Sequence, residues 1–357
     1  MATILTMRFN EKQAAIVSDE STWHTGVFYD YRRTNYGEFI YPLMNKEGED
    51  GHKISAIYAG VGFPAFHKEI SDIAKKEFEL MMKNGECSRL NMQKNIYKIF
   101  DKVHKRYVND RLNFHYGIDL DNLNSGSFTR NKKSYELKQT SVKKEARKVV
   151  GYGDRGDAMQ RIFENSGLFV SYDEKSGIDG TVIAPGYNGT AFSSIITVVG
   201  HGSRVSNVAV NKNIVEKMNL TQRREGFSME EGLYKLLNIS SQTFEMTNKM
   251  GGYFQIVIID MSKEKIEDRV VEICDHRSRL THEIMKAVIY GFLDEKRAME
   301  LNSKLLLKGE TFEKINEELM NSVTEKEKFK LRLQGYKMFK NDSADDNFKE
   351  EAKNDNN

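Results

Sequence analysis

The sequence has few of the features that mark secreted, membrane-bound or metal-bound proteins. It contains two cysteines in 357 residues, Cys87 and Cys274, far apart and without the C-x-x-C spacing of a metal knuckle. A disulfide framework is equally unsupported, which favours residence inside the cell. No apolar run approaches the ~20 residues that span a bilayer, and the first residues lack the regions of a signal peptide. The sequence therefore predicts a cytoplasmic protein without a membrane partner.

Excess charge of one sign is also missing. The chain carries 54 basic and 52 acidic side chains, a formal net charge of +2. A nearly neutral protein does not attract nucleic acid through its overall field. The basic stretch 130–148 contains one aromatic residue, Tyr135, and so lacks the rings on which single-stranded bases stack. We read this stretch as a solvated loop and expect no nucleic-acid partner.

What is present points to a globular protein larger than one typical domain. Hydrophobic residues make up 39% of the chain, with 20 Phe and 16 Tyr, which is enough for a sizeable core. The mean hydropathy of -0.60 indicates a well-solvated surface. A length of 357 residues favours two domains, or one large domain with additions.

Hydrophobic patterns divide the chain into strands and helices. Two β-rich runs at 2–9 and 13–19 flank a polar turn and predict a hairpin, and a strand at 53–62 ends on glycines. Apolar residues at helical spacing predict helices at 64–85 and 88–112. Further strands are expected within 168–200 and at 253–262. Between them, Ser228 and Glu231 form a capping box that begins another helix.

These patterns predict a main domain at 1–262 with two insertions. The first, at about 20–52, is Gly- and Tyr-rich without a sustained period and is expected to be a long loop, with a short hairpin as the one regular element it could contain. The second, at about 113–150, is polar and basic. Residues 263–340 are charged with helical spacing and predict a helical extension. Residues 341–357 have too few apolar side chains to fold and predict a disordered tail.

The order of these elements resembles the proteasome β-type family of N-terminal nucleophile hydrolases. The segment MATILTMRFN at 1–10 is similar to the start of the bacterial proteasome-like peptidases. AAIVSD, KISAIYAGVG, VVGHGS and NKMGGYFQIVIID follow in the family's order, and the match covers about residues 2–262. The resemblance implies an α+β fold, a four-layer α-β-β-α sandwich, here with a C-terminal helical extension.

The resemblance also implies a chemistry that depends on a free terminal amine. In this family the hydroxyl of a terminal threonine attacks a peptide carbonyl, and its own α-amine takes the proton. Two alignments compete for that position. Anchoring on Asp19 places Thr3 there, whereas matching the first ten residues places Ala2 there and lengthens the hairpin turn by one residue. Thr3 could act only after Ala2 has been removed, because an acylated nitrogen is not a base.

The remaining catalytic positions are carried over from the family one by one. Asp19 matches the acidic residue that holds a lysine beside the amine. Counting back from Gly60 without a gap places Lys46 at the lysine position, with Lys53 as the alternative. Gly60 matches the glycine whose backbone N–H receives the oxyanion. The family's turn serine falls on His201, which could serve as a base in an altered site.

The leading hypothesis is a proteasome-like hydrolase of peptide or amide bonds, of the threonine protease type, that needs no metal or other cofactor. Its expected partners are a peptide or protein substrate and further copies of the chain, forming a homo-oligomer that could be a ring. One alternative is a catalytically silent subunit that builds a ring or binds another protein. Another is a nucleotide-binding protein, because GYGDRG at 151–156 fits the G-x-G-x-x-G phosphate loop.

Overall fold

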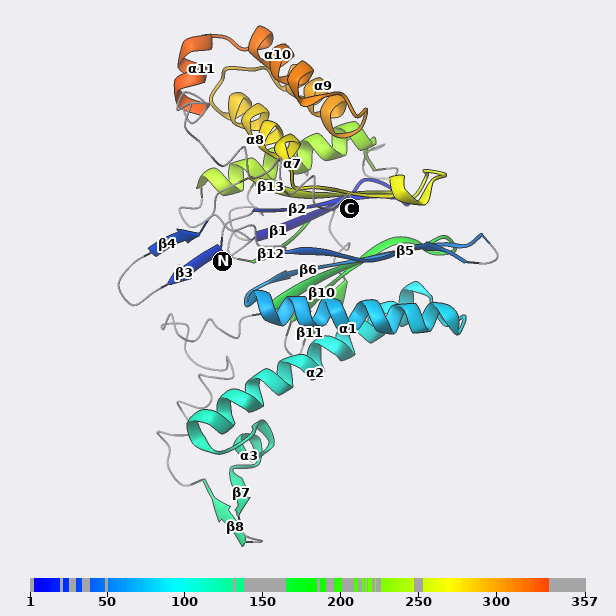
Figure 1. The fold of residues 1–357 in the computed structure, drawn as a ribbon, viewed down its shortest axis with the longest axis vertical. Helices are drawn as coiled ribbons and strands as arrows, with labels where there is room; N and C mark the ends of the chain where they lie inside the picture. The colour runs from blue at the N-terminus through cyan, green and yellow to red at the C-terminus, as the bar shows by residue number, and fades with distance from the viewer. Residues whose placement is uncertain are drawn as a thin grey trace, which may run out of the picture. The chain divides into compact units, whose positions relative to one another are not determined.

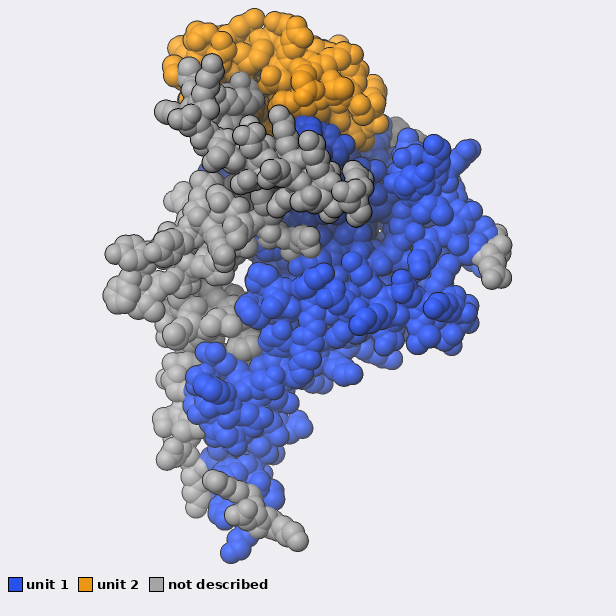
Figure 2. All heavy atoms as spheres, in the orientation of Figure 1, with its two compact units in different colours: residues 1–278 blue, residues 279–357 orange. Residues whose placement is uncertain are grey.

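The computed structural model describes most of the chain, in two compact units. The described residues are 3–19, 22–25, 30–33, 39–48, 51–130, 133–137, 165–184, 187–190, 196–200, 209–210, 214, 216, 218–219, 222, 226–246 and 253–333, and at 22–25, 30–33, 130, 187–190 and 332–333 only the backbone is described. The first unit spans Met1–Ser278 and the second Arg279–Asn357 (Figure 2).

The first unit is built on two five-stranded sheets (Figure 1). One has the order β12-β1-β2-β13-β14 and the other β11-β10-β9-β6-β5, and all neighbouring strands in both are antiparallel. The strands of the first sheet are β1 (Thr3–Arg8), β2 (Gln13–Asp19), β12 (Ile196–Gly200), β13 (Phe254–Asp260) and β14 (Val270–Ile273). Those of the second are β5 (Ile40–Glu47), β6 (Lys53–Val61), β9 (Ser166–Asp173), β10 (Gly177–Ala184) and β11 (Tyr187–Thr190).

Alternate residues of both sheets meet in one shared core. Side chains on successive strand positions point to opposite faces of a sheet, so every second residue can enter the same core. The first sheet contributes Ile4, Ala14, Ile16, Val199, Val257 and Ile259, and the second contributes Ile57, Ala59, Leu168, Val170 and Tyr172. The two sheets therefore face each other through this cluster.

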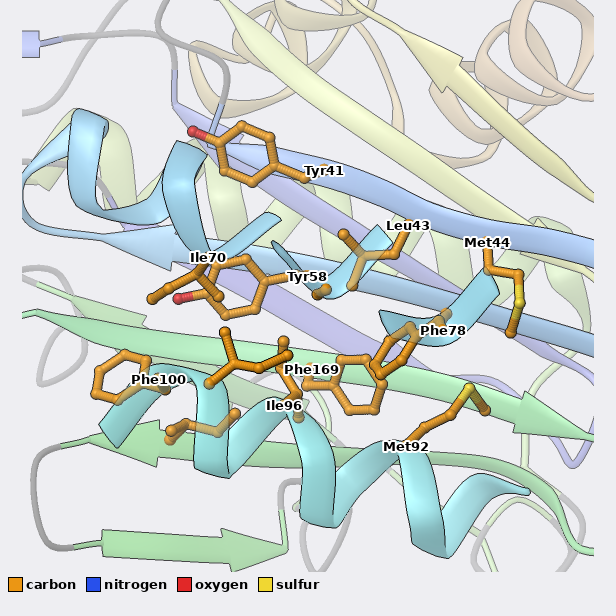
Figure 3. Packing of buried hydrophobic residues seen from close by; sticks show 14 of the residues in the cluster. Tyr41, Leu43, Met44, Tyr58, Ile70, Phe78, Met92, Ile96, Phe100 and Phe169 are labelled. Atoms are coloured by element: carbon orange, nitrogen blue, oxygen red, sulfur yellow. The ribbon is translucent and has the colours of Figure 1, made fainter. Parts of the chain in front are cut away.

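Two long helices cover the second sheet. The helix α1 (Pro64–Lys83) begins on a proline at its first turn and contacts β5 and β6, and α2 (Arg89–Tyr116) is capped by Ser88 and contacts β9 and β10. Figure 3 shows the core between these helices and the sheet, where Tyr58 and Phe169 lie among Ile70, Phe78, Ile96 and Phe100.

The helix α7 (Met229–Met246) packs on the first sheet, in contact with β1 and β2. The ring of Phe244 lies 5.5 Å from that of Phe254 on β13, centroid to centroid. A Cβ atom at Gly232 would lie 2.3 Å from the ring of Phe9, so glycine is required where this helix approaches the turn after β1.

Smaller elements complete the described chain. Beyond the second sheet, the end of α2 packs with α3 (Leu120–Ser125) and the hairpin β7 (Ser127–Arg130) and β8 (Lys133–Glu136) around Val108, Leu112 and Leu123. The strands β3 (Thr22–Thr25) and β4 (Asp30–Arg33) pair with each other, and a 3-10 turn, η3 (Ile266–Asp268), precedes β14. The helix α8 (His276–Ile289) crosses the unit boundary, and the second unit continues with α9 (Glu295–Leu306), α10 (Phe312–Ser322) and α11 (Lys326–Leu333).

The structure confirms the α+β class, the first hairpin and the three helices expected in the main domain. It corrects three boundaries. The stretch 20–52 does contain a short hairpin, β3–β4, but it is not otherwise one long loop, because Ile40–Glu47 forms β5, whose pattern is disguised by a bulge between Pro42 and Met44. The insertion at 113–150 contains the end of α2, α3 and a hairpin. The helical extension begins later than residue 263, since β14 adds a strand to the first sheet. The tail 341–357 lies outside the described residues.

Candidate functional site

Thr3 and Asp19 meet at the ends of the first two strands. The backbone N–H of Thr3 donates a hydrogen bond of 2.8 Å to Oδ1 of Asp19, and both residues are fully buried. The hairpin register explains the contact, because Ile4 pairs with Ser18 and the next residues outward are Thr3 and Asp19. The structure thus brings together two of the residues that the resemblance selects.

Both side chains lie on the face of the sheet that is turned away from the other sheet. Asp19 is directly opposite Phe254, and residues opposite each other in an antiparallel pair share a face. Phe254 contacts Phe244 of α7, so this face is the helix side. Ile4, the neighbour of Thr3, lies in the core between the sheets. Strand alternation therefore places Thr3 on the α7 side as well.

The chemistry of the Thr3 nitrogen follows from its bond to Ala2. An amide nitrogen donates a proton to Asp19 but has no basic lone pair with which to activate a hydroxyl. If the chain were cut before Thr3, a carboxylate in direct contact would favour the protonated form of the new amine, which is not a base. The Thr3–Asp19 pair as it stands therefore holds the strand ends together and does not supply a general base.

Lys46 lies at the turn of the β5–β6 hairpin, at the end away from Asp19. Its Nζ is 3.5 Å from Oε1 of Glu79 on α1, and both side chains are about half exposed. It pairs with Ile54, whereas the end of β5 nearest the first sheet's Asp19 is Ile40. Six residues at ~3.3 Å each separate Lys46 from Ile40 by roughly 20 Å. The structure does not bring Lys46 to Asp19.

Lys53, the alternative, does not reach Asp19 either. It starts β6 opposite Glu47, at the same distant end of the hairpin as Lys46. The residue that lies across from Gly60 is Phe39, whose side chain is buried and apolar. Counting back from Gly60 without a gap selected Lys46, but the hairpin is longer than this count assumes, so Phe39 and not Lys46 lies across from Gly60.

Gly60 has its backbone N–H in a hydrogen bond and the ring of His67 packed against its α-carbon. Its N–H donates a hydrogen bond of 2.9 Å to the carbonyl oxygen of Phe39. A Cβ atom at this position would lie 2.1 Å from Nδ1 of His67, so the imidazole of α1 packs directly on the glycine. An oxyanion donor needs a free N–H, and the N–H of Gly60 is bound within the sheet.

His67 is neutral in this environment. Burial lowers the pKa of its imidazole to about 4, opposed by a backbone hydrogen bond at Val61. Its Nδ1 lies 2.8 Å from the hydroxyl oxygen of Tyr58. Burial also raises the pKa of Tyr58 well above its ordinary value, and the nearby Tyr41 adds to this. The pair is thus an uncharged hydrogen bond inside the core.

A polar cluster that sequence reasoning missed lies between the sheets at this end. Gln255 on β13 is 3% exposed and contacts Ser18 and the backbone of Phe39 and Ile40. The available signal was Gln255 itself, the one polar residue before Asp260 ends the strand run FQIVIID, since an amide in an otherwise apolar stretch must find partners when buried. The sequence could not reveal which partners these are.

Several predicted features lie outside the described residues. His201, Ala2 and the GYGDRG segment at 151–156 are among them, so their roles stay predictions. Within the described part of the chain, no group of three or more His, Cys, Asp or Glu side chains could hold a metal ion. None of the described helices combines the length and the apolar character needed to cross a membrane.

Comparisons with known proteins show a similarity in structure but none in sequence. No family model matches the sequence, and no curated protein matches it. Among solved structures, the chain is similar to Anbu (ancestral beta-subunit) from Yersinia bercovieri, at 11% sequence identity and a TM-score of 0.49, over 81% of this chain and 94% of that one. Values this low leave the function of the chain to be argued from its own residues.

Proposed function

We propose that this chain is a proteasome-like subunit that serves in an assembly or in protein binding, without hydrolysis at Thr3. The observation that carries the proposal is the position of Thr3, which is fully buried on the α7 face with its amide N–H bound to Asp19. Neither Lys46 nor Lys53 lies at the end of the hairpin nearest Asp19. A catalytic threonine would need exposure, a free amine and a nearby cation.

The proteasome-like part of the proposal is supported by the arrangement of the first unit. Two five-stranded antiparallel sheets share a core, and β1 is an inner strand of one of them. The helices α1 and α2 contact one sheet, and α7 contacts the other. These layers are in keeping with the four-layer α-β-β-α sandwich that the resemblance implies.

A threonine hydrolase is the second candidate, and one contact favours it. The hypothesis requires that Thr3 and Asp19 be neighbours, and the N–H of Thr3 lies 2.8 Å from Oδ1 of Asp19. Hydrolysis would need removal of Met1 and Ala2, followed by a rearrangement that brings the Thr3 hydroxyl out of the buried face. The two candidates therefore differ in the state of the N-terminus.

The test is to determine the N-terminus and the reactivity of the purified full chain. Intact mass and N-terminal sequencing should show Thr3 inside the chain, and an electrophilic threonine-hydrolase probe should not label it. The hydrolase would be established instead if the wild type begins at Thr3 and is labelled by the probe, and if this labelling is lost in Thr3→Ala and retained in Thr6→Ala. Thr6 is the matched control because it lies buried on the same strand, with its hydroxyl bonded to Ala15 O.

The assembly role has its own measurement. Light scattering coupled to size exclusion should give the mass of at least two 41.1-kDa chains, or the mass of this chain plus that of a bound protein. A monomer at every concentration, with no protein retained, would contradict this part of the proposal.

A further inference from the structure

Gln255 is a buried polar side chain on the core face of its strand. It shares a face with Val257 and Ile259, both of which lie in the core between the sheets. Placing an amide there without partners would cost free energy, so its contacts have a structural purpose. It is also directly opposite Ser18, next to the Thr3–Asp19 pair.

Both the oxygen and the nitrogen of the Gln255 side-chain amide form hydrogen bonds. Its Oε1 accepts hydrogen bonds from the N–H of Phe39 at 3.1 Å and from the hydroxyl of Ser18 at 3.4 Å. Its Nε2 donates to Oε1 of Glu272 at 2.9 Å and to the carbonyl of Ile40 at 3.5 Å. The N–H of Phe39 requires an oxygen as its acceptor, which sets the orientation of the amide.

These bonds join the two sheets at the entry to β5. Gln255 and Glu272 belong to β13 and β14 of the first sheet, whereas Phe39 and Ile40 begin the β5 edge of the second. The carbonyl of Phe39 in turn accepts the N–H of Gly60 at 2.9 Å. A continuous chain of hydrogen bonds thus runs from Glu272 through Gln255 and Phe39 to Gly60.

We propose that Gln255 is a latch that holds Phe39 against Gly60 and so keeps the N–H of Gly60 occupied. When the latch is closed, as in this structure, this N–H is hydrogen-bonded to the carbonyl of Phe39. When Phe39 leaves, the same N–H becomes free to bind an anionic or carbonyl oxygen. Gln255 is therefore a positioning residue that acts on Gly60 through Phe39, and the inference does not depend on whether Thr3 is catalytic.

Amide hydrogen exchange on the full chain tests the latch. The Gln255→Leu variant keeps the apolar contacts of the side chain but loses all of its hydrogen bonds. Exchange of the Gly60 N–H should become roughly 5- to 10-fold faster, because the contact between Phe39 and Gly60 then loses the support of about one net hydrogen bond. Exchange at Ile54, at the far end of the same hairpin, should not change. Gln93→Leu is the matched control, because Gln93 also links two elements through its Nε2, to Asp179 at 3.3 Å.

A second variant protects the test against a folding failure. Glu272 is exposed, so Glu272→Ala removes only the outer anchor of the amide and should give a smaller acceleration at Gly60. Unchanged exchange at Gly60 in both folded variants would overturn the proposal. Equal acceleration at Gly60 and Ile54 would overturn it too, since that result would indicate general destabilisation.

Discussion

The two ends of the β5–β6 hairpin are tied to the first sheet by different chemistry. At the far end, the guanidinium of Arg269 is 1% exposed, and it bonds Oε2 of Glu47 at 2.6 Å and the carbonyls of Lys263 and Glu264 at 3.1 and 2.7 Å. At the near end, the neutral amide of Gln255 holds Phe39 and Ile40.

This difference indicates which end can open. A buried guanidinium is costly to leave unpaired, so the far end should stay closed whenever the protein is folded. Neutral hydrogen bonds contribute about 1 kcal/mol each, and their loss is correspondingly cheaper. By these polar contacts alone, the near end, which carries Gly60, is expected to open more easily than the far end, although Phe39 and Ile40 must then leave the core between the sheets. Four substitutions or conditions examine this comparison.

The largest effect is expected from Arg269→Met. The variant loses the ion pair to Glu47 and the bonds to two carbonyls that shape the turn before β14, so the free energy of unfolding should fall by about 3 kcal/mol. Urea unfolding followed by circular dichroism measures this. A loss no greater than that of Gln255→Leu would break the proposed difference between the two ends.

Acid should weaken the near end through His67. Its folded pKa of about 4 lies below the ordinary value of 6.5, so between these pH values the unfolded chain binds a proton that the folded chain does not. The contribution is complete above pH 6.5 and is lost as the pH falls, by about 3 kcal/mol at pH 4. Urea unfolding at several pH values should show a steeper decline for the wild type than for His67→Phe. Parallel declines would exclude His67 as the source.

Gly60→Ala should cost about 2 kcal/mol through overpacking. The new methyl group would lie within 2.1–2.7 Å of the His67 ring, so the imidazole must move. The double variant with His67→Ala should lose less than the sum of the two single changes, because the clash is then removed. Strict additivity in this double-mutant cycle would show that the close approach is not the reason for the glycine.

The smallest effect is expected from Lys46→Met. Its ion pair with Glu79 is exposed to solvent, so the free energy of unfolding should change by less than about 0.5 kcal/mol. Urea unfolding of Lys46→Met and Arg269→Met, two changes at the same end of the hairpin, compares the loss of an exposed charge with the loss of a buried one. A loss as large as that of Arg269→Met would contradict the solvated position of Lys46.

Local patterns predicted most of the regular elements. The β-rich runs at 2–9 and 13–19 yield β1 and β2, and helical spacing yields α1 and α2 close to their observed ends. The two helices bury one stripe, which leaves a helical period in the sequence, whereas β1 and β2 are buried on both faces and are marked by a continuous apolar run between polar turns. The strand β5 was missed because a bulge and the polar end Asn45–Glu47 interrupt its period.

The site could be predicted only in part. Thr3 and Asp19 meet because a hairpin joins them, and a hairpin is a local structure. Lys46 was misplaced because counting residues cannot reveal the length of a hairpin or its bulge. The contact between Gln255 and Phe39 joins positions 216 residues apart, and no local period carries that information.

The sequence by itself determined which residues share a face, since strand and helix periods follow from backbone geometry. Only the tertiary structure decided what each face meets. Ile4 looks into the second sheet and Thr3 toward α7, a choice made when the sheets and helices bury their apolar surfaces against one another. For the same reason, the N–H of Gly60 is occupied by Phe39, a partner that packing and not residue order brings to it.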